Sequence, residues 1–294
     1  MTSETGPVLV LGATGGQGGA VAAALLRAGR PVRALVRDPA SPRARQLSAA
    51  GAQLAAGEFT DHDALVAGMR AVSAVFAVTT PFEAGVADEV RQGTAIVASA
   101  TAARVPHLVF SSVAGATAGT GIPHFDSKAA TERALAASDV PHTVVAPTYF
   151  YDNALGGYRD LLDGVFELPL PANHPLQQLD RLDLGGFVEL VLRDPRAYAG
   201  RRIELASDAP TPAQMSAALA DALGRHVRYA EVPMAAVRRG SADMAAMWDF
   251  LRGAGYQVDI AALRSDYPAV GWTSFAGWAD RALGPGAAII GTTT

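Results

Sequence analysis

The chain lacks cysteine, has a single lysine and contains only short apolar segments. The absence of cysteine excludes disulfides, thiolate nucleophiles and cysteine-bound metals, and it fits a reducing, cytoplasmic location. No apolar run is suited to a membrane span. The formal net charge is −4 and no basic block stands out, so we expect no direct contact with nucleic acid.

Metal binding is also disfavoured, because the six histidines are dispersed without the spacing of metal ligands. The 294 residues are 50% hydrophobic and 18% charged, which excludes disorder and predicts one large or two coupled globular domains. The first residues lack the basic segment of a signal peptide. We expect the tail Gly284–Thr294 to be frayed.

Short β-branched runs alternate with stretches of helical periodicity. Because such alternation forms a parallel sheet covered on both faces, we predict an α/β fold with a Rossmann-type, doubly wound sheet. Helices are expected at Ala20–Ala28, after a cap at Asp61, and at Glu83–Arg104. The six expected strands begin near Val8, Val32, Gln53, Ala74, Leu108 and Thr143.

After Pro147 the pattern changes to a loop-rich stretch, Tyr149–Pro175, with five aromatic residues that could line a pocket or bind a partner. We place the Rossmann domain at residues 1–150, with later strands from about 176–206 interleaved, and a smaller α/β domain at 151–294. Elements expected there are Leu184–Leu192, Arg202–Leu205, Thr211–Leu223 with a cap at Thr211, and Val227–Val232.

A glycine-rich turn follows the first expected strand and leads into a helix. Gly12 permits the tight turn, Gly15 lets a pyrophosphate approach the backbone, and Gly18 allows close packing of helix and strand. The helix N-terminus then presents free N–H groups to phosphates. The spacing G-x-x-G-x-x-G therefore predicts a dinucleotide site, with a plain glycine-rich turn as the alternative.

The residue after the second strand is Arg37. A carboxylate there would hold the ribose hydroxyls of NAD, whereas a guanidinium pairs with a 2′-phosphate. We therefore predict NADP(H) in preference to NAD(H). A shift of one residue would bring Asp38 to the ribose and reverse this preference. Arg43 and Arg45 either assist Arg37 or lie on a solvated helix face.

Other strand ends also qualify by position, because the carboxyl edge of such a sheet lines the ligand crevice. Thr79 and Thr80 follow the fourth strand, and Glu58 and Asp61 follow the third. Turn formation and helix capping are the alternative roles, and for Asp61 capping is favoured.

Lys128 stands alone among 23 arginines. A chain that uses arginine for nearly every cation places its one ammonium where a compact donor is needed, although an exposed helix lysine is the alternative. Lys128 follows His124-Phe125-Asp126-Ser127 and begins an expected helix to Ala137.

Six segments are recognisable as a set: Gly12–Gly18, Val36–Pro39, Val90–Gly93, Pro123–Lys128, Pro147–Phe150 with Asn153, and Asp183–Gly185. Together they resemble the NmrA-like family of atypical short-chain dehydrogenase/reductases, with the nearest likeness to its NADPH-sensing HSCARG-type branch. The resemblance spans nearly the whole chain, and the His-Phe-Asp-Ser-Lys segment is its most specific part.

The resemblance implies a Rossmann domain carrying a smaller α/β domain, with NADP(H) between them. It implies that Arg37 binds the 2′-phosphate and Lys128 the nicotinamide ribose, and that Pro147, Tyr149 and Phe150 pass beside the nicotinamide. The residues implied at the pyrophosphate are Gly12, Thr14, Gly15, Gln17 and Gly18.

The chain departs from catalytic relatives at the acid, since their Tyr-x-x-x-Lys pair has His124 at the tyrosine position here. Imidazole is a side chain suited to proton transfer near neutral pH, so His124 could supply the proton, and packing near the cleft is the equal alternative. With Lys128, we take His124 and Tyr149 as catalytic candidates. Other donors that we consider are Tyr151, Ser111 and Ser112.

These features favour an NADPH-dependent oxidoreductase that acts on a small, flat carbonyl, quinone or enone. The alternative is a non-catalytic regulatory protein that senses NADP(H) and acts through protein contacts. An epimerase or dehydratase is disfavoured because the Tyr-x-x-x-Lys pair is missing. The expected partners are a small-molecule substrate or a regulatory protein, with a homodimer as a further option.

Overall fold

The structure, a computed structural model, describes residues 6–285. The chain forms two compact units. The first unit comprises Met1–Pro147 and Leu184–Glu204, and the second comprises Thr148–Asp183 and Leu205–Thr294. The predicted fraying of the tail falls almost wholly on residues outside the described range.

The first unit is built on a seven-stranded sheet in the order β10-β6-β5-β4-β1-β2-β3. Strand β1 pairs in parallel with both β2 and β4, and the pairs β2–β3, β4–β5 and β5–β6 are also parallel. The chain order reverses between β1 and β4, and such a switch point is where open α/β sheets bind ligands. The strands are β1 (Val8–Leu11), β2 (Val32–Val36), β3 (Gln53–Ala56), β4 (Ala74–Val78), β5 (Leu108–Ser111), β6 (His142–Pro147) and β10 (Arg202–Leu205).

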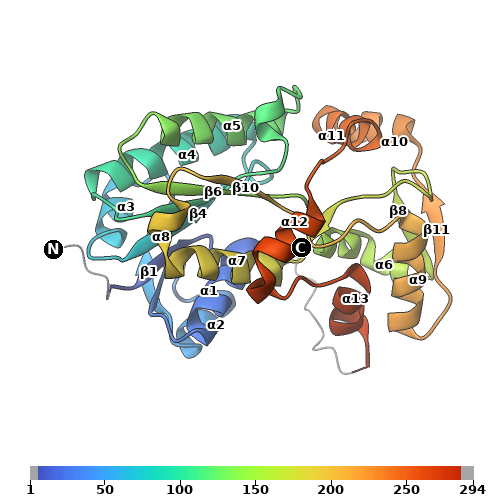
Figure 1. Ribbon diagram of the computed structural model, residues 1–294, viewed down its shortest axis with the longest axis horizontal. Coiled ribbons are helices and arrows are strands. Elements are labelled where there is room, and N and C mark those ends of the chain that lie inside the picture. The colour runs from blue at the N-terminus through green and yellow to red at the C-terminus, as the bar shows by residue number, and fades with distance from the viewer. Residues whose placement is uncertain (1–5, 286–294) are drawn as a thin grey trace. The chain divides into compact units, whose positions relative to one another are not determined.

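Helices cover both faces of this sheet, which confirms the predicted Rossmann-type fold (Figure 1). Helices α3, α4 and α5 lie on one face, and α1, α2 and α7 lie on the other. Leu9, Phe110 and Ile96 belong to the apolar core between the sheet and the first of these helix layers. The helices are α1 (Gly16–Arg27), α2 (Pro42–Ala49), α3 (His62–Gly68), α4 (Val86–Ala102), α5 (Pro123–Ala136), α7 (Arg181–Arg193) and α8 (Pro195–Tyr198), with a short 3-10 helix η1 (Ala116–Ala118).

The second unit contains two small parallel sheets, β8 with β11 and β7 with β9. Helix α9 packs against α13, and the buried ring of Tyr151 contacts Phe275 and Trp278. Its elements are β7 (Tyr149–Phe150), η2 (Tyr151–Gly157), α6 (Tyr158–Leu162), β8 (Val165–Leu168), β9 (Gln178–Leu179), α9 (Pro212–Leu223), β11 (Arg228–Glu231), α10 (Met234–Gly240), α11 (Ala242–Arg252), α12 (Ile260–Asp266), η3 (Pro268–Val270) and α13 (Phe275–Leu283).

Local capping signals are confirmed. The side chain of Asp61 accepts a hydrogen bond from Ala64 N at the start of α3. Thr211 caps α9 in a reciprocal arrangement with Gln214. Both caps satisfy backbone N–H groups that a helix start leaves without partners.

Three expected boundaries are wrong. Helix α4 begins at Val86 because Gly85, with φ of +88°, precedes it, so Glu83 lies on a loop. Helix α5 begins at Pro123, which places Lys128 inside it. The stretch Tyr149–Pro175 is not mainly loop, since β7, η2, α6 and β8 occupy much of it.

Candidate functional site

The glycine turn joins β1 to α1 at the switch point of the sheet. Gly12 has φ of +72°, which a side chain would disfavour, and its carbonyl accepts from Gly15 N at 2.9 Å. A Cβ on Gly18 would lie 2.3 Å from Gly12 O, so only glycine lets the helix approach this closely. No side chain caps α1, and Gly15 and Gly16 are exposed. The first turn of α1 therefore offers free N–H groups to an anion.

Two polar side chains tie this turn to neighbouring elements. Arg43 of α2 donates from Nη1 to Thr14 O at 3.2 Å. Ser111, at the end of β5, donates to Gln17 Oε1 at 2.7 Å. Arg43 thus supports the backbone of the glycine turn. Whether it also assists Arg37 stays a prediction.

Arg37 follows β2, the neighbour of β1, and its side chain is 71% exposed. Its Nη1 lies 3.2 Å from Oε2 of Glu83, on the loop between β4 and α4. The carboxylate of Asp38 accepts from Ala40 N at 2.8 Å and so completes a local turn. Of these two side chains, Asp38 is therefore held in its own turn, whereas Arg37 extends to a neighbouring loop.

Lys128 is buried, with 7% of its surface exposed, so the alternative of an exposed helix lysine is wrong. Its Nζ donates to Thr79 O at 2.5 Å and lies 2.9 Å from Oε1 of the fully buried Glu89. A longer bond of 3.5 Å reaches Ser111 O. Burial lowers the pKa of Lys128, and the Glu89 carboxylate opposes that shift. A compact ammonium fits this cluster of acceptors.

Glu89 completes a buried network that sequence reasoning missed. Its Oε1 accepts from Thr79 Oγ1 at 3.0 Å, and its Oε2 accepts from Ser127 Oγ at 2.5 Å. A signal was present, since Glu89 lies on the same buried stripe of α4 as Gly93, Ile96 and Ala100. A carboxylate on an apolar stripe requires a partner.

The two threonines after β4 differ. Thr79 is buried and bonds Lys128 and Glu89, whereas Thr80 is partly exposed and its hydroxyl accepts from Phe82 N at 3.4 Å. Thr79 therefore positions Lys128. The contact of Thr79 with a coenzyme, and that of Thr80, stay predictions.

His124 occupies the first turn of α5 and is 9% exposed. Its ring centroid lies 4.9 Å from that of Phe125, edge-on, and 5.9 Å from that of Phe82. Phe82 is 73% exposed, so the contacting rings of His124 and Phe82 extend from the interior to the surface.

Ser112 belongs to a second buried network. It donates to Oε1 of Glu132, whose Oε2 lies 2.9 Å from Nε of Arg202. Arg202 also bonds Glu204, and Pro147 O accepts from Ala114 N at 2.9 Å. These bonds fix the ends of β5, β6 and β10, and they commit the Ser112 hydroxyl to Glu132.

In the second unit, Tyr149 packs against Trp248 with ring centroids 5.5 Å apart. Burial raises the pKa of the Tyr149 hydroxyl, and its hydrogen bond with Asn153 opposes the shift. The Arg181 guanidinium lies over the Phe150 ring, 5.6 Å from its centroid. Tyr149 and Phe150 belong to a different unit from Lys128, so their placement beside a nicotinamide stays a prediction.

Two aromatics of the expected loop are instead core residues. Tyr151 is fully buried and donates to Thr273 O at 3.0 Å, and Phe166 is 3% exposed. Their expected role in lining a pocket or a partner surface is wrong for this reason. The Tyr151 hydroxyl is likewise committed to the backbone.

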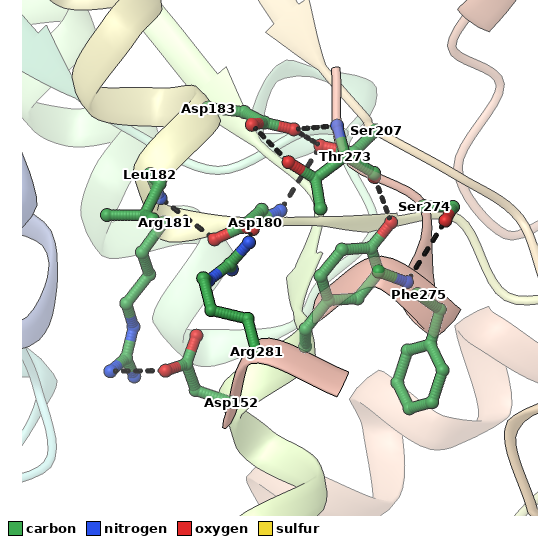
Figure 2. A network of polar contacts seen from close by, with 12 residues as sticks. Asp152, Asp180, Arg181, Leu182, Asp183, Ser207, Thr273, Ser274, Phe275 and Arg281 are labelled. Atoms are coloured by element: carbon green, nitrogen blue, oxygen red, sulfur yellow. Dashed lines mark hydrogen bonds and ion pairs between the residues drawn. The ribbon is translucent and has the colours of Figure 1, made fainter. Parts of the chain in front are cut away.

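A polar network joins Asp183 to Ser207 and Thr273 (Figure 2). Oδ2 of Asp183 accepts from Ser207 Oγ at 2.6 Å and Thr273 N at 2.7 Å, and Oδ1 accepts from Thr273 Oγ1 at 2.9 Å. Asp180 pairs with Arg281. Burial raises the pKa of Asp183, and the hydrogen bonds from Ser207 and Thr273 oppose it. The hydrogen bonds of Asp183 with Thr273 connect the start of α7 to the segment that precedes α13.

Within residues 6–285, no group of three or more histidine or acidic side chains could hold a metal ion. None of the helices in this range combines the length and apolar character needed to cross a membrane.

Comparison with known proteins identifies the family. Residues 4–275 match the NmrA-like family. This chain belongs to the NmrA-like family. The family predicted from the sequence motifs is thus confirmed.

A curated relative, the NAD(P)H azoreductase of Xenophilus azovorans, is 30% identical over 238 residues, which is 81% of each chain. Among solved structures, the NADPH-dependent quinone oxidoreductase of Escherichia coli, complexed with NADPH, superposes with a TM-score of 0.77 at 24% identity, over 93% of this chain and 99% of that one. NmrA, a negative transcriptional regulator, in complex with NADP, gives 0.77 at 22% identity over 95% and 96%. At these identities the two structures establish the fold.

Proposed function

We propose that this protein is an NADPH-dependent oxidoreductase that reduces a small, flat quinone, enone or carbonyl compound. The observation that carries the proposal is the carboxyl edge of β1 and β2, where the Gly12 turn, the uncapped start of α1 and the exposed Arg37 guanidinium lie on adjacent strands. Free N–H groups suit a pyrophosphate, and a guanidinium suits a 2′-phosphate. Family membership and the azoreductase relative support the same chemistry.

The residues fit NADPH as follows. Arg37 would hold the 2′-phosphate. Lys128 would donate to the nicotinamide ribose through the N–H that now points to Ser111 O, because this hydrogen bond, at 3.5 Å, is the longest that its ammonium makes. Bound NADPH would supply the hydride. The pyrophosphate would be held by Gly12, Thr14, Gly15, Gln17 and Gly18.

We assign proton donation to His124, which lies one helical turn before Lys128. Tyr149 is the alternative donor, although burial raises its pKa and so makes its hydroxyl a weaker acid. His124→Phe and Tyr149→Phe distinguish the two: a loss of turnover with a changed pH profile in His124→Phe assigns the proton to His124, and a loss of turnover in Tyr149→Phe alone assigns it to Tyr149.

A regulatory, non-catalytic protein is the second candidate. It is favoured by the contacts of Lys128, whose ammonium already bonds Thr79, Glu89 and Ser111. Such a protein would bind NADPH without consuming it.

The decisive experiment mixes purified protein with NADPH and a panel of quinones, enones and azo dyes, and follows the absorbance of the reduced nicotinamide. Consumption supports the enzyme, and tight binding without consumption supports the regulator. By calorimetry, Arg37→Ala should weaken NADPH binding at least about tenfold, as expected for lost charge-assisted bonds, and NADH binding much less. Arg27→Ala, at an exposed position in the last turn of α1 and therefore at the opposite end of that helix from the glycine turn, is the matched control. Equal losses of NADPH and NADH would overturn the role of Arg37.

A further inference from the structure

The loop Pro81–Gly85 joins β4 to α4 at the switch point of the first unit's sheet. It is a tight turn, with Gly85 N donating to Pro81 O at 2.7 Å and Phe82 N donating to Thr80 Oγ1. Its Glu83 reaches the strand-end of β2, two positions away in the sheet, and pairs with Arg37 at 3.2 Å. The Glu83 carboxylate therefore contacts the Arg37 guanidinium, which is the group that we propose binds the 2′-phosphate.

Both members of this pair are open to solvent, with 71% of the Arg37 side chain and 62% of the Glu83 side chain exposed. An exposed pair with one close contact is weak and readily exchanged. An incoming phosphate is therefore able to displace Glu83, but it must then share the site with a like charge.

We propose that Glu83 sets coenzyme selectivity by competing with the 2′-phosphate for Arg37. This inference rests on the proposed function. Glu83 opposes the binding of a 2′-phosphorylated ribose in two ways: it occupies the Arg37 guanidinium and it repels the phosphate. A ribose without the 2′-phosphate meets neither effect. The chain thus carries a residue that moderates the preference for NADP(H) that Arg37 creates.

The test uses adenosine 2′,5′-bisphosphate and adenosine 5′-monophosphate, which differ only in the 2′-phosphate, and measures their Kd by calorimetry. Glu83→Gln should tighten binding of the bisphosphate by about two- to fivefold, the range of an exposed pair, and leave the monophosphate unchanged. Asp38→Asn is the matched control for loss of one negative charge, because the Asp38 carboxylate is turned to Ala40 N. It should change neither Kd.

The double variant Arg37→Ala/Glu83→Gln tests whether Glu83 acts through Arg37. In the Arg37→Ala background, Glu83→Gln should have a smaller effect on the bisphosphate than in the native chain. An undiminished effect, an unchanged Kd in Glu83→Gln, or an equal gain in Asp38→Asn would each overturn the inference. If Arg37→Ala alone weakens both nucleotides equally, the 2′-phosphate role fails as well. If it selectively weakens the bisphosphate while Glu83→Gln is silent, only the inference fails.

Discussion

The Lys128 ammonium lies 2.9 Å from the Glu89 carboxylate, and both side chains are buried. Removing one partner of a buried ion pair leaves an uncompensated charge, at a typical loss of about 3–5 kcal/mol. The pair also links α4 to α5 and to the end of β4, because Thr79 bonds both residues. It therefore organises the part of the first unit that carries His124.

The first prediction concerns this pair. Glu89→Gln and Lys128→Met should each lower the free energy of unfolding by about 3 kcal/mol, whereas the double variant should lose no more than either single variant. Urea unfolding of the four proteins gives the coupling. Additive losses would show that the two charges act independently.

Local patterns predicted the strands and caps because each depends on residues close in sequence. Val8–Leu11 is apolar with two β-branched valines, Gly12 ends it, and Asp61 caps α3. Burial follows directly from such runs, and turn geometry follows from glycine. These features required no knowledge of the tertiary structure.

The network around Lys128 was predictable only in part. The rarity of lysine marked Lys128 as special, but its partner Glu89 lies far away in the sequence and is brought close by the packing of α4 on α5. The residues around Glu83 favour a helix, which is why the sequence predicts one there. The positive φ of Gly85 places the start of α4 after it, so Glu83 lies on the loop. Contacts of this kind depend on packing, which a single sequence does not specify.

The second prediction concerns the contact between α7 and α1. A Cβ on Gly185 would lie 2.6 Å from Ala20 O and 2.9 Å from its carbonyl carbon, and backbone atoms cannot move aside cheaply. Gly185→Ala should therefore lower the free energy of unfolding by about 1–3 kcal/mol, as overpacking does.

The matched control is Gly68→Ala in α3, where the new Cβ would make ordinary contacts of 3.6–3.9 Å with Leu35 and Leu9. Because alanine has the higher helix propensity, this variant should be neutral or stabilised by up to about 1 kcal/mol. Thermal unfolding of both variants checks the contrast. An equal loss in each would mean that the cause is not the close helix contact.

The third prediction concerns the network in Figure 2. Asp183→Ala removes the acceptor for Thr273 N and for the hydroxyls of Thr273 and Ser207, and leaves the partly buried Thr273 amide without that partner. The expected loss is about 2–4 kcal/mol. Asp249→Ala, which breaks an exposed pair with Arg238, should change stability by no more than about 0.5 kcal/mol.

Hydrogen exchange gives a more local measure of the same network. Asp183→Ala should reduce the protection of the Thr273 amide, whose acceptor it removes, and Asp249→Ala should not. Retained protection in Asp183→Ala would mean that another group holds the segment before α13.

The fourth prediction concerns pH and His107. The side chain is 2% exposed, and burial, with a smaller effect of His142, lowers its pKa from 6.5 to about 4. Thr143 Oγ1 donates to Tyr198 O at 2.8 Å, so its contact of 2.9 Å with His107 Nε2 requires a proton on that nitrogen. The neutral ring with Nε2 protonated is therefore the form that the fold selects.

The sign of the pH effect follows from linkage. Between pH 6.5 and about 4 the unfolded chain binds a proton at His107 that the folded chain does not, so stability falls as the pH falls through this window. Above pH 6.5 both states are neutral and this effect vanishes. The loss is on the order of 3 kcal/mol at the acid end.

His107→Gln keeps a donor for Thr143 but cannot titrate. Urea unfolding at pH 7.5 and pH 5 should show a smaller loss on acidification for this variant than for the native chain. His226→Gln, at an exposed position, is the matched control and should retain the native pH dependence. An unchanged pH dependence in His107→Gln would assign the acid sensitivity to other groups, because this substitution removes the imidazole that titrates.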